Sequence, residues 1–340
     1  MEKTCFWTLC LWQREEGIEM RIAVTGSEGM IGSALAKKLR QQGNEVIECT
    51  RKSCNILEQE KIKSAFMGCG VVIHLAAQLD EQAPELWEVN VKGTENVLEA
   101  CAENQIEQLI FLSSVGVYGA QKGLKTEETA TQPETIYEKS KLEAEKKVLS
   151  FQEVFHVTIL RPAIVLGNNT YWRQIIKAIG KGYPLIGNGK NHWQTVSVED
   201  VVSAIAFCIG KEECYGETFI AAEKAAITLE ELVALVRKEA GISKPVQKIP
   251  FFLGYLAAHF NALIKFVPML TPPYVKRMQA DRWYSTAKLE ALGWKAKDSS
   301  REILPKIAAM VFSEKGKTTG QKMERGGNEN PKAIGKQCQK

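Results

Sequence analysis

A tyrosine and a lysine four residues apart are the residues of this sequence whose types and spacing could do chemistry. Tyr137 and Lys141 lie in the segment YEKSK, near the start of a helix that we predict over 133–149, and their spacing puts both on one face. An ammonium group held near a phenol favours the phenolate and lowers its pKa. Such a tyrosine can take a proton from an alcohol near neutral pH, or give one to a carbonyl. The pair alone is equally consistent with two surface residues of a charged helix.

A serine directly after a predicted strand is the third candidate. Ser114 stands in the segment SSVGVYG (113–119), which follows a strand predicted over 109–112. The carboxyl ends of parallel strands line the cofactor crevice of α/β sheets, so Ser114 is placed to hydrogen-bond the same substrate oxygen as Tyr137. Lys141 can also hold the ribose of a nicotinamide cofactor, whose oxidised ring would lower the tyrosine pKa further.

Three glycines separate the first predicted strand, 21–25, from the first predicted helix, 33–42. Gly26, Gly29 and Gly32 form a G-x-x-G-x-x-G loop. Gly26 permits the tight turn, Gly29 lets the backbone approach a pyrophosphate, and Gly32 lets helix and strand pack closely. A plain strand-to-helix turn would not need three glycines at this spacing, so the loop predicts a dinucleotide site.

Strands and helices alternate through the first half of the chain. The apolar patterns predict further strands and helices, the strands over 45–49, 71–75 and 157–160 and the helices over 56–67 and 84–101. This alternation predicts an α/β fold, a doubly wound parallel sheet (Rossmann fold) covered by helices on both faces.

The rhythm loosens from about residue 167, where we expect a smaller C-terminal α/β substrate cap. The patterns predict one more strand, over 217–221, and helices over 199–209, 228–240, 251–267, 286–292 and 301–312. The expected organisation is an arm that is disordered or precedes the working start at Met20 (1–19), an NAD(P)-binding domain (20–166), a substrate-binding portion interleaved with the sheet (167–312) and a disordered basic tail (313–340).

Composition is that of an ordinary globular protein, with 45% apolar and 25% charged residues in 340. The net charge of +4 resides in the tail, and the near-neutral body indicates neither nucleic acid nor an anionic membrane as a partner. Nine cysteines without C-x-x-C spacing favour a reduced, cytoplasmic chain without a metal site.

No segment predicts an integral membrane span. Glu2, Glu15 and Glu16 are unlike a signal peptide. The most apolar window, 251–270, is interrupted by His259, Asn261, Lys265 and Pro268, which favours a buried or amphipathic helix. Its aromatic and aliphatic residues also leave open an apolar ligand or a peripheral membrane contact.

Taken in order, the motifs TGSEGMIG, SSVGVYG and YEKSK resemble the extended short-chain dehydrogenase/reductase superfamily, in its NAD-dependent epimerase/dehydratase group. HLAA (74–77), VNVKGT (89–94), RPAIVLG (161–167) and SVEDVV (197–202) are similar to further motifs of that group. The resemblance extends over about 20–312 and implies the Rossmann fold, a nicotinamide cofactor and an enzyme. We interpret His74 as a satisfied core residue.

The resemblance also implies roles by position. Ser114, Tyr137 and Lys141 would be the catalytic set, with Asn90 as an active-site support. The cofactor-binding residues would be Gly26, Gly29, Met30, Ile31 and Gly32 at the pyrophosphate, Asn55 and Ile56 near the adenine, Leu75, Ala76 and Ala77 near the ribose, and Pro162 to Ile164 near the nicotinamide. Tyr137 and Lys141 would also contact the cofactor.

Two departures from the family pattern narrow this prediction. Members that use NAD usually carry an acidic residue at the end of the second strand, where this chain has cations, and Arg51 can grip a 2′-phosphate. This favours NADP, although Glu48 remains an alternative ribose ligand and a solvated turn is the alternative interpretation of Arg51. Sugar-nucleotide dehydratases place an Asp-Glu pair where this chain has Val115 and Gly116, so a dehydratase is disfavoured.

The function predicted first is an NAD(P)-dependent oxidoreductase that interconverts a secondary alcohol and a ketone, on a nucleotide sugar or a hydroxysteroid- or dihydroflavonol-like substrate. The alternative is a sugar-nucleotide 4-epimerase with tightly bound NAD, and a non-catalytic binding protein is disfavoured.

Arg173 is a candidate phosphate ligand in the substrate portion. Family members commonly dimerise through the helices here predicted over 84–101 and 133–149, so we expect a homodimer, with Ala100, Leu142 and Val148 as candidate interface residues.

Overall fold

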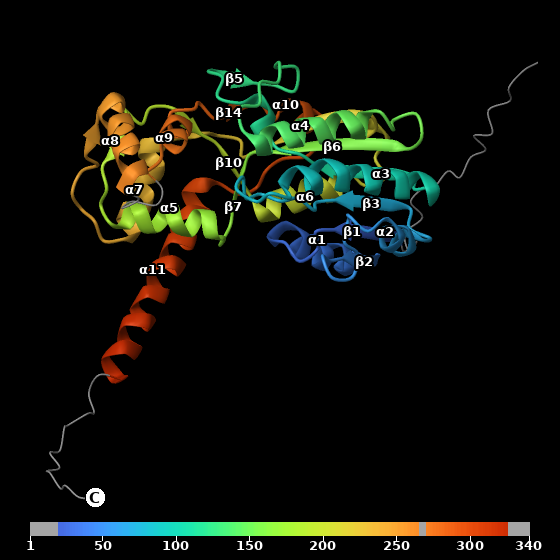
Figure 1. The fold of residues 1–340 in the computed structure, drawn as a ribbon, viewed down its shortest axis with the longest axis horizontal. Coiled ribbons are helices and arrows are strands. Elements are labelled where there is room, and N and C mark those ends of the chain that lie inside the picture. The colour runs from blue at the N-terminus through green and yellow to red at the C-terminus, as the bar shows by residue number, and fades with distance from the viewer. Residues whose placement is uncertain (1–19, 265–269, 326–340) are drawn as a thin grey trace, which may run out of the picture. The chain divides into compact units, whose positions relative to one another are not determined.

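Two compact units make up the computed structural model, which describes residues 20–264 and 270–325 (Figure 1). The first unit comprises the described residues up to Val165, with Gln194–Ala226 and Ala280–Asp298. The second comprises Leu166–Trp193 and the described parts of Ile227–Gln279 and Ser299–Lys340. The chain therefore leaves the first unit close to the predicted boundary at residue 166 and later returns to it twice.

A six-stranded sheet is the centre of the first unit. Its order is β2-β1-β3-β4-β6-β11, and all five pairings are parallel. The strands are β1 (Arg21–Thr25), β2 (Glu45–Cys49), β3 (Val71–His74), β4 (Gln108–Leu112), β6 (His156–Pro162) and β11 (Glu217–Ala221). The predicted doubly wound parallel sheet is confirmed, with every strand end within two residues of its predicted place.

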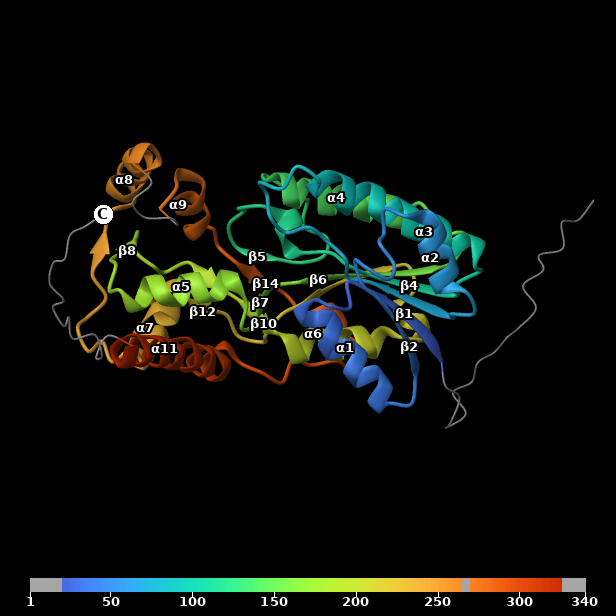
Figure 2. The same cartoon turned by 60° about the horizontal axis from the view of Figure 1, so that its bottom comes forward.

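Alternate residues of each strand pack on opposite faces of this sheet. In β1, Ile22 and Val24 join one apolar cluster and Ala23 joins the other. The first cluster includes residues of α1 (Met30–Gln41) and α6 (Val198–Cys208), and the second includes residues of α2 (Gln59–Phe66), α3 (Gly93–Glu103) and α4 (Ile136–Leu149). Figure 2 shows α1 and α6 on one side of the sheet and α3 and α4 on the other. Each fully buried aliphatic side chain stabilises this arrangement by about 1.5–3 kcal/mol.

Shorter elements complete the first unit. The helix predicted over 84–101 is two elements, because a π-helical turn at Glu88–Lys92 leads directly into α3. The remaining elements are the 3₁₀ turns Val115–Tyr118 and Glu212–Cys214, the helix α10 (Ala287–Ala291), and the paired short strands β5 (Leu124–Lys125) with β14 (Trp283–Tyr284) and β7 (Ile164–Leu166) with β10 (Thr195–Ser197).

The second unit is mainly helical. Its helices α5 (Thr170–Gly180), α7 (Leu229–Glu239) and α11 (Ser300–Arg325) pack on one another, and α8 (Phe251–Ile264) packs on α9 (Pro272–Met278). Two small sheets join β8 (Leu185–Ile186) to β13 (Lys248–Ile249) and β9 (His192–Trp193) to β12 (Ile227–Thr228).

Three helices of the second unit differ from the sequence prediction, and its four short strands were not predicted. α5 and α9 were not predicted, although Asn169 and Thr271 each cap the following helix by accepting a backbone N–H bond. α11 continues past Phe312 to Arg325, so the segment predicted as a disordered tail begins as helix. The predicted arm 1–19, residues 265–269 of the apolar window and the end of the tail lie outside the described residues.

Neither unit's described helices include one that is both long and apolar enough to cross a bilayer. The six cysteines in the described part of the chain are free thiols. In the same part, no three His, Cys, Asp or Glu side chains gather in a way that could hold a metal ion.

Candidate active site

The glycine loop after β1 leaves the N-terminus of α1 without a side-chain cap. Gly26 has a φ of +69°, and the amide of Gly29 donates to its carbonyl at 3.0 Å. A Cβ on Gly26 would lie 2.8 Å from the Ala76 amide nitrogen, and one on Gly32 would lie 2.7 Å from the Ser27 Cα. Gly29 is the N-cap residue of α1, and no acidic residue occupies the first turn. The helix dipole and these close backbone approaches fit the pyrophosphate of a dinucleotide.

Ser27 supports this assignment from inside the loop. Its side chain is 1% exposed, and its hydroxyl oxygen has no hydrogen-bond partner within the described structure. Buried hydroxyl groups rarely stay unpaired, so an additional ligand at the loop is expected. Met30 and Ile31, predicted at the pyrophosphate, lie half-buried in the first turn of α1.

His74 joins the carboxyl ends of β1 and β3 to helix α3. Its Nδ1 lies 2.7 Å from the hydroxyl of Thr25, and its Nε2 lies 3.0 Å from the hydroxyl of Thr94. Burial lowers the pKa of His74 to about 3, so the ring is neutral at physiological pH. Thr25 also accepts from the amides of Leu75 and Ala76, at 3.2 and 3.3 Å. The prediction of a structural histidine is confirmed, and the histidine positions two predicted cofactor-binding residues.

Asn90 connects the loop after β3 to helix α4, which carries Tyr137. It lies in the π-helical turn before α3 and is 2% exposed. Its Nδ2 donates to the Ser140 hydroxyl at 2.9 Å and to the Gln78 carbonyl at 3.0 Å, while its Oδ1 accepts from the Gln78 amide at 2.7 Å. Ser140 in turn donates to the Tyr137 carbonyl at 2.7 Å. This geometry is that of a support, as the resemblance implies, because the Asn90 side chain is occupied by protein groups.

Ser114 and Tyr137 come together beyond the end of β4. Ser114 caps the 3₁₀ turn by accepting from the Gly116 amide at 3.0 Å, and Tyr137 lies in the first turn of α4. A capping box between Thr135 and Glu138 fixes the start of α4. Burial raises the pKa of Tyr137 to about 12, although a hydrogen bond with the Ser114 side chain opposes the rise.

Lys141 is buried one helical turn after Tyr137. It is 3% exposed, and its Nζ lies 4.1 Å from the centroid of the Phe111 ring. Burial lowers the pKa of Lys141 to about 7, and the Glu145 carboxylate opposes the shift. The pKa of Tyr137 is raised and not lowered as expected, because the effect of burial outweighs that of the Ser114 hydrogen bond. Desolvation disfavours the phenolate form of Tyr137 and the ammonium form of Lys141.

The sequence did not predict a buried ion pair that lies next to Lys141. Arg161 donates to both carboxylate oxygens of Glu145, at 2.9 and 2.6 Å, and to the Tyr118 hydroxyl at 2.8 Å. Glu145 lies on α4 one turn beyond Lys141. Arg161 and Tyr118 belong to the two motifs RPAIVLG and SSVGVYG, which is the signal that could have pointed to this contact.

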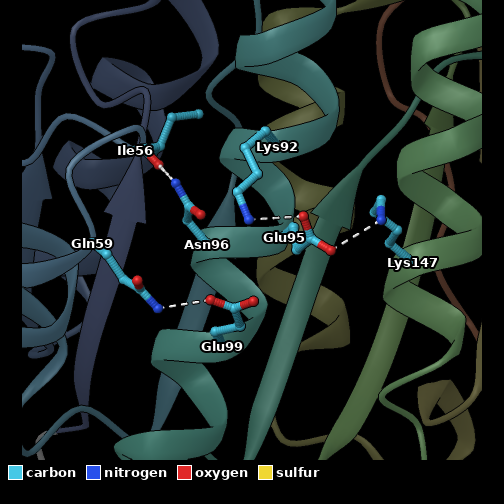
Figure 3. A network of polar contacts seen from close by, with 7 residues as sticks. All are labelled: Ile56, Gln59, Lys92, Glu95, Asn96, Glu99 and Lys147. Atoms are coloured by element: carbon cyan, nitrogen blue, oxygen red, sulfur yellow. Dashed lines mark hydrogen bonds and ion pairs between the residues drawn. The ribbon is translucent and has the colours of Figure 1, made fainter.

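One predicted adenine residue, Ile56, is held by helix α3, as Figure 3 shows. Asn96 donates to the Ile56 carbonyl at 2.9 Å, and Gln59 donates to Glu99 at 2.7 Å. In the first turn of the helix, Glu95 pairs with Lys92 and Lys147 at 3.0 and 3.1 Å. Ile56 is buried and Asn55 is half-buried in the loop before α2.

The two arginines that are predicted to bind phosphate groups differ in their surroundings. Arg51 is exposed in the turn after β2, whereas Glu48, the alternative ribose ligand, pairs with Arg40 of α1. Arg173, the candidate phosphate ligand, makes an ion pair with Glu314 at 2.6 Å within the second unit. Pro162 and Ile164 lie at the end of β6 and the start of β7.

The first unit combines a parallel sheet and a glycine loop with a serine, a tyrosine and a lysine beyond β4. This combination defines a class of dinucleotide-dependent enzymes. The family model of the NAD dependent epimerase/dehydratase family matches residues 22–220 of the chain. The chain therefore belongs to that family, whose members include NAD-dependent epimerases, dehydratases and dehydrogenases, and it is an enzyme.

Relatives of different activity match most of the chain. N-acetyl-alpha-D-glucosaminyl-diphospho-ditrans,octacis-undecaprenol 4-epimerase of Escherichia coli O157:H7 is 27% identical over 81% of this chain and 90% of its own. The decarboxylating sterol-4-alpha-carboxylate 3-dehydrogenase of Saccharomyces cerevisiae is 29% identical over 65% of this chain and 70% of its own. The structure of Thermus thermophilus UDP-glucose 4-epimerase in complex with NAD shares the fold, with a TM-score of 0.67, 24% identity and coverage of 86% and 99%.

Proposed function

We propose that this enzyme is an NAD(P)-dependent oxidoreductase that interconverts a secondary alcohol and a ketone, with Tyr137 as the general acid and base. The observation that carries the proposal is the hydrogen bond between Ser114 and Tyr137, with buried Lys141 one turn further along α4. The uncapped glycine loop lies at the same carboxyl edge of the sheet. A nicotinamide bound there supplies the hydride or accepts it.

The protonation states favour the reductive direction. A tyrosine with a pKa of about 12 keeps its proton at neutral pH and can donate it to a carbonyl oxygen. Ser114 orients that oxygen. Lys141, with a pKa of about 7, divides between ammonium and amine near neutral pH. Its ammonium form would favour the phenolate that remains after proton donation.

The substrate classes that we propose are a nucleotide-linked sugar and a hydroxysteroid-like alcohol. The UDP-glucose 4-epimerase that shares the fold supports the first class, and the sterol dehydrogenase supports the second. The Escherichia coli relative is an epimerase of a polyprenyl-linked sugar. The test is a screen of purified protein for oxidation of NADH and NADPH with nucleotide sugars and apolar ketones. Reduced cofactor consumed in proportion to ketone supports the proposal.

A sugar 4-epimerase is the second candidate, favoured by the Escherichia coli relative. An epimerase retains its cofactor and returns the hydride to the substrate, so it turns over without added nucleotide. Acid extraction of the purified protein distinguishes the two functions. Stoichiometric bound NAD with epimerisation and no net cofactor consumption would replace the oxidoreductase proposal by the epimerase one.

The preference for NADP rests on Arg51 alone. The related structure named above holds NAD and lends NADP no support. Exposed Arg51 has room to contact a 2′-phosphate, whereas Glu48 is engaged with Arg40. Titration of NAD and NADP against the wild type and Arg51→Ala tests the preference. A selective loss of NADP affinity supports it, and equal affinities in both proteins contradict it.

A homodimer through α3 and α4 remains a proposal. Ala100 and Val148 are fully buried in the core cluster of the first unit, so their packing partner is the sheet and they are unavailable to a second copy. Leu142 is half-buried and remains a candidate. Sedimentation velocity at micromolar concentration tests the assembly, and a monomer would contradict it.

A further inference from the structure

Helix α8 of the second unit presents large apolar side chains outward. Phe252, Leu256 and Phe260, spaced four residues apart on one face, are 67%, 66% and 64% exposed. Phe251, Leu253 and Tyr255 are 37–45% exposed beside them. Single exposed apolar residues are ordinary on a protein surface, but a contiguous group of this size marks an interaction site.

The opposite face of α8 is narrow and made of small or polar residues. Among residues 251–262, whose burial is described, the buried positions of the helix are Gly254, Ala258 and Asn261. A Cβ at Gly254 would meet Ile186 Cγ1 at 2.9 Å, and Ala258 packs with Ile186 and Val275. Asn261 donates to the Leu270 carbonyl at 2.8 Å. This close packing determines the orientation of the helix, so the outward direction of the aromatic residues is built into the second unit.

The sequence around α8 carries cations and no anion. Residues 240–280 contain Lys244, Lys248, Lys276 and Arg277, besides Lys265 outside the described residues, and no aspartate or glutamate. Lys248 is paired with Glu230 of α7 at 2.7 Å, so the local excess rests on the other cations. The near-neutral charge of the whole body conceals this local excess. Exposed aromatic residues beside lysine and arginine are typical of surfaces that enter the headgroup region of an anionic bilayer.

The length of α8 excludes a span. Fourteen residues extend about 21 Å, against a hydrocarbon core of about 30 Å. A second copy of this chain is the other occupant that an apolar ridge suggests. A symmetric contact through α8 would bring two purely cationic segments together, and like charges oppose that pairing.

We propose that α8 is an interfacial helix that docks the second unit on the surface of an anionic lipid bilayer. Phe252, Leu256 and Phe260 enter the boundary between headgroups and acyl chains, and the surrounding cations attract the lipid charge. The proposal concerns binding alone and does not depend on the catalytic assignment.

Vesicle flotation tests the proposal on the full chain. The probes are vesicles of phosphatidylcholine and vesicles that also contain about one third phosphatidylglycerol. We expect the wild type to float with the anionic vesicles and to be partly released by added salt. The triple variant Phe252→Gln, Leu256→Gln, Phe260→Gln should bind at least about tenfold more weakly, because three apolar insertions are lost.

The matched control replaces three equally exposed apolar residues elsewhere. Met67, Val154 and Met310 are 59%, 51% and 52% exposed, and their triple change to Gln should leave vesicle binding within about twofold of the wild type. Circular dichroism and thermal melting establish that both triple variants are folded. Equal loss of binding in the control would overturn the assignment to α8.

Two further results would overturn the proposal. One is a wild type that floats with neither type of vesicle. The other is a wild-type dimer in sedimentation velocity that the α8 triple variant converts to a monomer without any change in flotation. In that case a second copy of the chain covers the helix.

Discussion

Helices α4 and α8 have the same length, fourteen residues, and depart from the usual pattern of a soluble helix in opposite ways. α4 buries charged and polar side chains, among them Glu138, Lys141 and Glu145. α8 exposes phenylalanine and leucine and buries glycine and alanine. Apolar residues inside and polar residues outside is the pattern that folding alone favours, so each reversal has a local cause.

The causes differ between the two helices. In α4 each buried charge has a partner within the first unit, since Glu145 pairs with Arg161 and the Lys141 ammonium faces the Phe111 ring. Burial lowers the pKa of Lys141 and raises that of Tyr137, and shifted pKa values of this kind are typical of groups that transfer protons. In α8 the reversal needs no internal compensation, because close packing of Gly254 on Ile186 orients the helix. The buried charges of α4 indicate proton-transfer chemistry. The exposed apolar face of α8 indicates contact with an apolar phase outside the protein.

The largest expected effect concerns the tyrosine of α4. Tyr137→Phe should lower kcat by about 10³-fold and leave cofactor affinity unchanged, because only the proton donor is lost. Steady-state kinetics and cofactor titration measure the two quantities. Tyr215→Phe, which removes a hydroxyl elsewhere in the same unit, should keep wild-type activity. If the Tyr137→Phe enzyme kept more than a tenth of that activity, the result would contradict a catalytic role of α4.

Lys141→Met should stabilise the protein at pH 6 by about 3 kcal/mol while impairing catalysis. The Lys141 pKa is about 7 in the folded state, against the ordinary lysine value of 10.5 that applies to the unfolded chain. Between these values only the unfolded chain holds the proton, so wild-type stability rises with pH, and below pH 7 the full penalty of charging is present. The advantage of the variant should therefore shrink from pH 7 to pH 10.

Chemical denaturation at several pH values measures this difference. Lys139→Met changes an exposed lysine on the same helix and should show no such pH dependence. A constant difference between the wild type and Lys141→Met across this range would mean that the buried lysine does not titrate there.

Gly254→Ala should destabilise the protein by about 1 kcal/mol. The new Cβ collides with Ile186, at a typical cost of about 1–3 kcal/mol, and the better helix propensity of alanine offsets about 1 kcal/mol of it. Thermal unfolding compares it with Gly70→Ala, where nothing lies within 4 Å of the new Cβ. A stabilised Gly254→Ala variant would mean that α8 can lie differently on its unit.

The smallest effect is expected on the outer face of α8. Phe252→Gln in lipid-free buffer should change the free energy of unfolding by no more than about 0.5 kcal/mol, because the ring is already in water. Ala258→Gln, on the buried face of the same helix, should be clearly destabilising. An equal loss in the free energy of unfolding for both changes would contradict the difference in burial between the two faces.

Local signals predicted most of the first unit and fewer details of the second. Short apolar runs between glycines predicted the strands of the sheet, since a doubly wound fold repeats one simple pattern. α5 was missed because its apolar positions, such as Trp172 and Ile175, follow turn-rich sequence with a single capping asparagine. The π-helical turn that carries Asn90 has no separate sequence signature, and the contact of Arg161 with Glu145 joins residues 16 apart through packing.

The sequence by itself determined the order of the elements, the glycine loop and the four-residue spacing of Tyr137 and Lys141, because each depends on neighbours along the chain. The tertiary structure decided two things that no local pattern contains. It raised the pKa of Tyr137 and lowered that of Lys141, since burial comes from distant elements such as β4. It also decided which face of the apolar helix α8 points outward, because the small residues Gly254 and Ala258 pack against Ile186.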